Sequence, residues 1–130
     1  MHLLTLIATG VAAAVHVWIF VLESLRWEHA DTRRIFGTTP EQAATTRQLA
    51  YNQGFYNLFL ALAASGGVVL AGWPVVSTTL LLVSLGSMLA AAVVLVTSDR
   101  RRARAALIQG GPPALALLAM GFSAFAGSPA

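Results

Sequence analysis

The sequence predicts an all-α integral membrane protein, a bundle of four transmembrane helices with both termini outside the cytoplasm. Three observations lead there. Of the 130 residues, 57% are hydrophobic and only 10% are charged, whereas about 25% of the residues of a soluble domain are charged. The apolar residues gather in four segments, each near the roughly 20 residues that span a bilayer as a helix. All eight basic residues are arginines, and they fall in two of the three connections.

The expected spans cover residues 3–25, 51–72, 75–97 and 105–126, and they form a single domain over residues 1–130. The first segment also resembles a signal peptide, because Ala12-Ala13-Ala14 looks like a small-residue cleavage region. Signal peptides carry a basic region before the apolar run. Here only His2 and the α-amino group precede it. We therefore expect a retained transmembrane helix.

The arginines predict the orientation. Arg26, Arg33, Arg34 and Arg47 lie between the first two spans, and residues 100–104 supply the other four arginines between the last two. Cytoplasmic loops of membrane proteins are enriched in Lys and Arg. Both arginine loops are therefore expected in the cytoplasm, with the N-terminus and the C-terminus outside. Such a short arginine run has little reach for nucleic acid, so we expect contact with anionic membrane lipids and no nucleic acid.

Two helix starts can be read locally. Thr39 is the expected N-cap of the second helix, with Pro40 at its first position and Gln42 closing a capping box. This helix should therefore begin in the cytoplasm and run into the membrane. Trp73 suits the outer headgroup region, and Pro74 can begin the third helix.

A few polar side chains lie where an apolar span is expected. A charge at the centre of such a helix costs about 2.5 to 3.5 kcal/mol. His16 and Glu23 are seven residues apart and should share one face of the first helix. On the second helix, Asn52 with Tyr56 and Gln53 with Asn57 form pairs four residues apart. These groups all fall in the cytoplasmic half, which predicts a vestibule open to the cytoplasm.

The candidate site follows from these residues. The catalytic candidates are His16 and Glu23, and the ligand-binding candidates are Trp27, Asn52, Gln53, Tyr56, Asn57 and Gln109. On the fourth span, Gly110-Gly111-Pro112-Pro113 predicts a break in the helix beside the vestibule, because proline lacks an N–H and disrupts the bond to the carbonyl four residues earlier.

Each polar group also has a structural interpretation. Glu23 can pair with Arg26 at the interface, and His16 can be a packed, hydrogen-bonded core histidine. The amides can be interhelical contacts worth about 0.6 kcal/mol each. One histidine and one carboxylate are too few for a metal site, and the chain has no cysteine, so we expect no metal and no cofactor.

The run Asn52-Gln53-Gly54-Phe55-Tyr56-Asn57 is distinctive. With His16, Glu23 and Trp27, then Phe36-Gly37 and Gln109-Gly110-Gly111-Pro112, it resembles a family of small bacterial membrane proteins catalogued as domain of unknown function 1304. The resemblance covers nearly the whole chain. It implies four spans in a bacterial cytoplasmic membrane and no established activity. The sequence departs from the family at Leu58 and in its doubled Gly-Gly-Pro-Pro.

The leading functional hypothesis is a pocket that binds a small amphipathic or lipid-like molecule. In an enzyme version, a membrane isomerase, His16 and Glu23 exchange protons. Two alternatives stay open: a small proton-coupled exporter that uses Glu23, and an accessory membrane subunit that packs through Gly86 and Ala90. A homo-oligomer is compatible with each of these.

Overall fold

The computed structural model describes residues 3–126, and within that range every regular element is helical. The chain runs through α1 (Leu3–Phe20), a π-helical turn η1 (Val21–Leu25), α2 (Ala30–Phe36), α3 (Pro40–Val69), α4 (Pro74–Ser98), a 3-10 turn η2 (Arg100–Arg102) and α5 (Ala103–Ala126). The all-helical prediction is confirmed for the described part of the chain. Three stretches are long and apolar enough to cross a membrane: Leu3–Leu25, Pro74–Ser98 and Arg100–Ser123.

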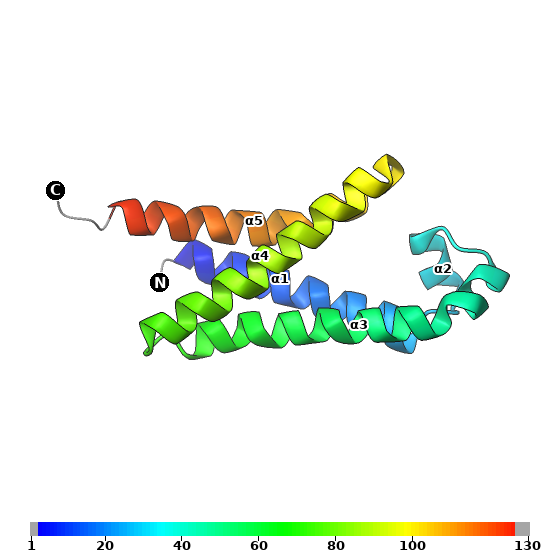
Figure 1. The fold of residues 1–130 in the computed structure, drawn as a ribbon, viewed down its shortest axis with the longest axis horizontal. Helices are drawn as coiled ribbons and strands as arrows, with labels where there is room; N and C mark the ends of the chain where they lie inside the picture. Colours follow the sequence, from blue (N-terminus) through cyan, green and yellow to red (C-terminus); the bar gives the residue numbers. More distant parts are fainter. Residues whose placement is uncertain (1–2, 127–130) are drawn as a thin grey trace.

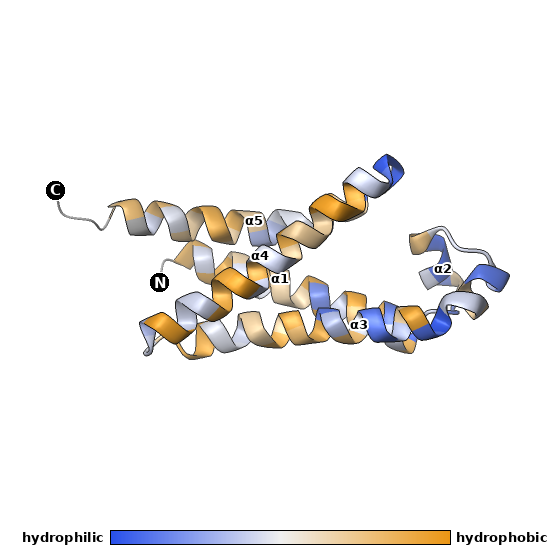
Figure 2. Ribbon diagram, in the orientation of Figure 1, coloured by the Kyte–Doolittle hydropathy of each residue, from blue (hydrophilic) through white to orange (hydrophobic). Residues whose placement is uncertain are grey.

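The helix α3 is not among those three stretches. It is the longest helix, and its first half is polar. Polar residues continue past the expected start of the span at residue 51, with Asn52 and Gln53 and, one turn further on, Asn57. Figure 2 shows this change, from hydrophilic near α2 to hydrophobic toward α4. The apolar part of α3 ends at Val69, so residues 70–72 of the predicted span belong to the turn that follows.

The four long helices pack side by side, α1 against α3 and α5, and α4 against α3 and α5. The start of α1, the end of α5 and the connection from α3 to α4 lie at one end of the molecule (Figure 1). Helix α2 and the connection from α4 to α5 lie at the other. The two arginine-containing connections are therefore at the same end, which we call the arginine end.

Small residues line the contacts between these helices. The buried positions of α3 include Ala50, Gly54, Ala61, Ala64 and Gly67. Gly67 approaches α4 so closely that a methyl group there would lie 2.7 Å from Cγ of Leu81. At the same crossing the Ser77 hydroxyl donates to the Gly67 carbonyl at 2.6 Å. Leu81, Leu85 and Met88 of α4 fill the centre of the core.

Both predicted helix starts are confirmed. Thr39 caps α3 with its side chain, Gln42 returns a hydrogen bond to the Thr39 backbone, and Pro40 takes the first position. Pro74 begins α4.

The predicted break in α5 is wrong. The helix continues through Pro112 and Pro113 without interruption, because the hydrogen bonds on either side of the prolines and the packing against α1 and α4 hold its backbone in place.

Candidate functional site

The site is built around the turn η1, where α1 changes from an α-helix to a π-helix. Residues Val21–Leu25 form this wider turn, and Glu23 lies within it. Single π-turns inside α-helices occur frequently at functional sites. The wider turn also alters the direction in which Glu23 leaves the helix, so the regular spacing that placed His16 and Glu23 on one stripe does not extend through this segment.

Helix α3 passes η1 at very short range because Gly54 has no side chain. A methyl group at Gly54 would collide with the Ser24 hydroxyl, and it would lie 3.0 Å from the Ser24 nitrogen and 3.1 Å from Cβ of Glu23. The Ser24 hydroxyl instead donates to the Tyr51 carbonyl at 2.8 Å. Gly54 therefore lets the π-turn lie directly on α3.

This close approach brings Asn57 to Glu23. The Asn57 side chain is buried, and its Nδ2 donates to Oε2 of Glu23 at 3.0 Å and to the Gln53 carbonyl at 3.1 Å. The bond to Glu23 joins two helices between residues that are 34 positions apart. A carboxylate held by an amide in this way has a defined orientation, and its second oxygen stays available to another donor.

Arg26 does not pair with Glu23. Its guanidinium binds Asp31 at 3.0 Å instead. The hydrogen bond from Arg26 holds the pKa of Asp31 below its usual value. Within residues 3–126, Glu23 takes part in no salt bridge.

His16 is fully buried inside the helix packing. Its Nδ1 lies 2.8 Å from the carbonyl oxygen of Ala12. A carbonyl only accepts, so Nδ1 carries the proton and Nε2 is left as an acceptor. Nε2 is buried and has no hydrogen-bond partner among the described residues. The contacts of His16 are thus those of a core histidine, and no hydrogen bond between residues of 3–126 joins it to Glu23.

An open hollow of about 630 Å³ lies where α3 meets η1 and the segment before α2. Most of the side chains that line it are charged, aromatic or otherwise polar. The lining consists of Glu23, Ser24, Leu25, Trp27, Glu28, His29, Arg47, Gln48 and Tyr51. Two of the predicted site residues, Glu23 and Trp27, belong to it. The hollow lies at the arginine end of the molecule.

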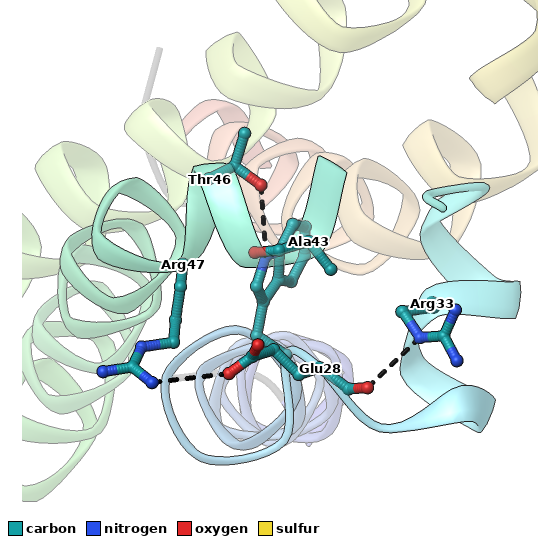
Figure 3. Close-up of polar contacts among 6 residues, drawn as sticks. Glu28, Arg33, Ala43, Thr46 and Arg47 are labelled. Carbon is teal, nitrogen blue, oxygen red and sulfur yellow. Dashed lines mark hydrogen bonds and ion pairs between the residues drawn. The ribbon is translucent and has the colours of Figure 1, made fainter. Parts of the chain in front are cut away.

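Trp27 fixes one wall of this hollow. Its indole Nε1 donates to the carbonyl of Ala43 at 3.1 Å and to the hydroxyl of Thr46 at 3.2 Å. Its ring packs on Phe36 with the centroids 5.0 Å apart. The two indole hydrogen bonds tie the segment before α2 to the first turns of α3, where Figure 3 shows the acceptors Ala43 and Thr46.

Glu28 and Arg47 line the hollow, and Arg33 contacts Glu28 from outside it. Arg47 of α3 reaches the Glu28 carboxylate at 3.5 Å, and Arg33 of α2 donates to the Glu28 carbonyl at 3.1 Å (Figure 3). Glu28 is thus contacted from two helices. The sequence predicts only a role in topology for these arginines, and it does not predict their place beside the site.

The other predicted residues lie elsewhere. Asn52, Gln53 and Tyr56 are exposed on α3, and only the backbone carbonyl of Gln53 takes part in the site, as an acceptor for Asn57. Gln109 is half-buried on α5, and within residues 3–126 its side chain makes no hydrogen bond. The structure therefore brings together Glu23, Asn57 and Trp27 and separates them from the remaining candidates. The sequence did carry a signal for the close approach: Gly54, the small residue inside the amide-rich run.

Comparison with known proteins places the chain in a family. No curated protein and no solved structure matches it. A family model described as "Protein of unknown function (DUF1304)" matches residues 10–121. This range includes η1, Gly54, Asn57 and all residues that line the hollow. Since the match covers most of the sequence, the chain belongs to the DUF1304 family.

Proposed function

We propose that this protein is a four-span protein of a bacterial cytoplasmic membrane that binds a small amphipathic or lipid-like molecule in the hollow beside Glu23. The observation that carries this is the Glu23 carboxylate, held by Asn57 at the end of an apolar helix and facing an open hollow. The polar end of the ligand would bind at Glu23 and Ser24. Its apolar part would lie along Leu25, Trp27 and Tyr51.

The membrane placement rests on charge and hydropathy. Three stretches are apolar enough to span, and we propose the part of α3 from Tyr51 onward as the fourth, because α3 packs against both α1 and α4. The arginine connections lie at one end of the molecule, and the N-terminal and C-terminal helix ends lie at the other (Figure 1). The positive-inside rule puts the arginine end, and with it the hollow, on the cytoplasmic side.

Binding is a better description of this site than isomerisation. Proton exchange between His16 and Glu23 needs both groups within reach of one substrate. His16 is fully buried and does not line the hollow. The proton-coupled exporter has less support as well, because Glu23 lies at the end of the span Leu3–Leu25 and not near its middle.

A photoreactive amphiphile tests the proposed function. An alkyl-diazirine probe with a small polar head would be added to the protein in nanodiscs and crosslinked, and the modified residues would be mapped by mass spectrometry. We expect labels on Leu25, Trp27 and Tyr51. Gln48→Trp, which places an indole in the hollow, should reduce these labels at least fivefold.

Leu49→Trp is the matched control, since Leu49 is the next residue, is exposed and does not line the hollow. It should leave the labelling pattern unchanged. Labels spread evenly over the lipid-facing side chains of all helices, with no response to Gln48→Trp, would refute the proposed binding site.

A further inference from the structure

The charges around the hollow indicate which polar group its ligand carries. We propose that the ligand carries an organic cation, an ammonium group or a close equivalent, and that Glu23 is its counter-ion. This inference rests on the proposed function, because it assigns a ligand chemistry to the same hollow.

Glu23 differs from the other acidic residues of the described chain. Glu28 pairs with Arg47 at 3.5 Å, Asp31 with Arg26 at 3.0 Å, and Asp99 with Arg101 and Arg102 at 3.6 Å each. Glu41 is exposed in the first turn of α3. Glu23 is half-buried, and its partner is the neutral amide of Asn57. An amide orients a carboxylate but does not offset its charge.

Carboxylates outnumber guanidinium groups among the side chains that line the hollow. Two carboxylates line it, Glu23 and Glu28, against one guanidinium, Arg47, and the imidazole of His29 lines it as well. Arg47 is already paired with Glu28, and Arg26 nearby is bound to Asp31. The charge left without compensation is therefore that of Glu23. A partly buried carboxylate gains from a cation that replaces the water it has lost.

The walls favour an organic cation over a metal ion. Trp27 and Tyr51 line the hollow, and aromatic faces attract ammonium groups that approach within about 6 Å of the ring. The indole is held by its bonds to Ala43 and Thr46, so its ring is already in place. Metal ions such as Ca²⁺ need several oxygen ligands, and within residues 3–126 no group of three or more His, Cys, Asp or Glu side chains is placed to hold a metal ion.

Competition between two amphiphiles of equal chain length tests this inference. Dodecyltrimethylammonium and the neutral tetraethylene glycol monododecyl ether would each displace the photoreactive probe from the protein in nanodiscs of zwitterionic lipid. We expect the wild type to bind the cation at least tenfold more tightly. Glu23→Gln should reduce this preference to less than threefold while leaving the affinity for the neutral ether within twofold.

The matched control is Glu41→Gln, which removes a carboxylate in the first turn of α3, outside the hollow. This variant should keep the wild-type preference for the cation. If Glu23→Gln does not fold, the ratio of the two amphiphile affinities in the wild type decides whether the hollow prefers a cation. Equal affinity for the two amphiphiles, or a preference that survives in folded Glu23→Gln, overturns the cation inference and leaves the proposed function standing. Failure of both amphiphiles to displace the probe from the hollow counts against the proposed function itself and, with it, the cation inference.

Discussion

Asn57 Nδ2 donates a hydrogen bond to Oε2 of Glu23 at 3.0 Å, and this contact joins the π-turn η1 to the middle of α3. It connects a half-buried carboxylate to a buried amide. It also orients the carboxylate that faces the hollow. The bond exists because Gly54, one turn earlier on α3, leaves room for η1.

A double-mutant cycle measures the Glu23–Asn57 contact. Asn57→Ala, Glu23→Ala and the double variant would be unfolded with SDS in mixed micelles, since each single change must remove the hydrogen bond. Hydrogen bonds between transmembrane helices contribute about 0.6 kcal/mol on average and up to about 1.7 kcal/mol. We expect a coupling free energy of about 1 kcal/mol, because the acceptor is a carboxylate. Additive effects of the two substitutions would show that the contact is absent in the membrane.

Gly54→Ala should destabilise the protein. The new methyl group would meet the Ser24 hydroxyl, the Ser24 nitrogen and Cβ of Glu23. Overpacking of this kind costs about 1 to 3 kcal/mol, more than the roughly 1 kcal/mol that alanine adds to a helix over glycine. The control is Gly86→Ala on α4, where nothing lies within 4 Å. Thermal unfolding should show a lower Tm for the first variant and an equal or higher Tm for the second.

Gly67 and Gly66 form a matched pair at the crossing of α3 and α4. A methyl group at Gly67 would lie 2.7 and 2.9 Å from side-chain atoms of Leu81 and 3.2 Å from its nitrogen, whereas one at Gly66 would lie 3.8 Å from Leu80. Gly67→Ala should therefore cost about 1 to 3 kcal/mol. Gly66→Ala should be neutral or stabilising by up to about 1 kcal/mol. Equal unfolding midpoints for the two variants would contradict the close α3–α4 approach.

Trp27→Phe keeps an aromatic ring against Phe36 and removes the indole donor to Ala43 and Thr46. Loss of a hydrogen bond of this kind costs about 0.5 to 1.5 kcal/mol. We expect faster proteolysis between residues 26 and 39, because this segment loses its attachment to α3. Trp73→Phe, at an exposed tryptophan, is the control and should not change the cleavage rate. Unchanged cleavage in both variants would mean that packing alone holds the segment.

The orientation of the protein in the membrane can be measured by labelling single introduced cysteines, since the natural chain has no cysteine. Ala44→Cys lies exposed at the arginine end, and Gly72→Cys lies exposed in the connection from α3 to α4. A membrane-impermeant maleimide added to intact cells should label the second variant, while the first should react only after lysis. The opposite pattern would reverse the proposed topology.

Several features of this fold follow from short stretches of sequence. The apolar runs predict long helices, and Thr39, Pro40 and Gln42 predict the start of α3 because a capping box involves only neighbouring residues. Pro74 marks the start of α4 for the same reason. Pro112 and Pro113 show the limit of such reasoning. A proline removes one backbone bond, but whether the helix breaks depends on the packing around it, and here α5 continues.

The sequence by itself determined that Glu23, Asn57 and Trp27 were candidates, because polar side chains beside apolar helices are costly and few. It did not separate Asn57 from Asn52, Gln53 and Tyr56. Only the tertiary structure decided that, by turning the face of α3 that carries Gly54 and Asn57 onto α1 and η1 and leaving the other three exposed. That choice depends on how the small side chains of α3 fit against a helix some 30 residues away, and Gly54 marks a possible close approach in the sequence without showing which segment it meets.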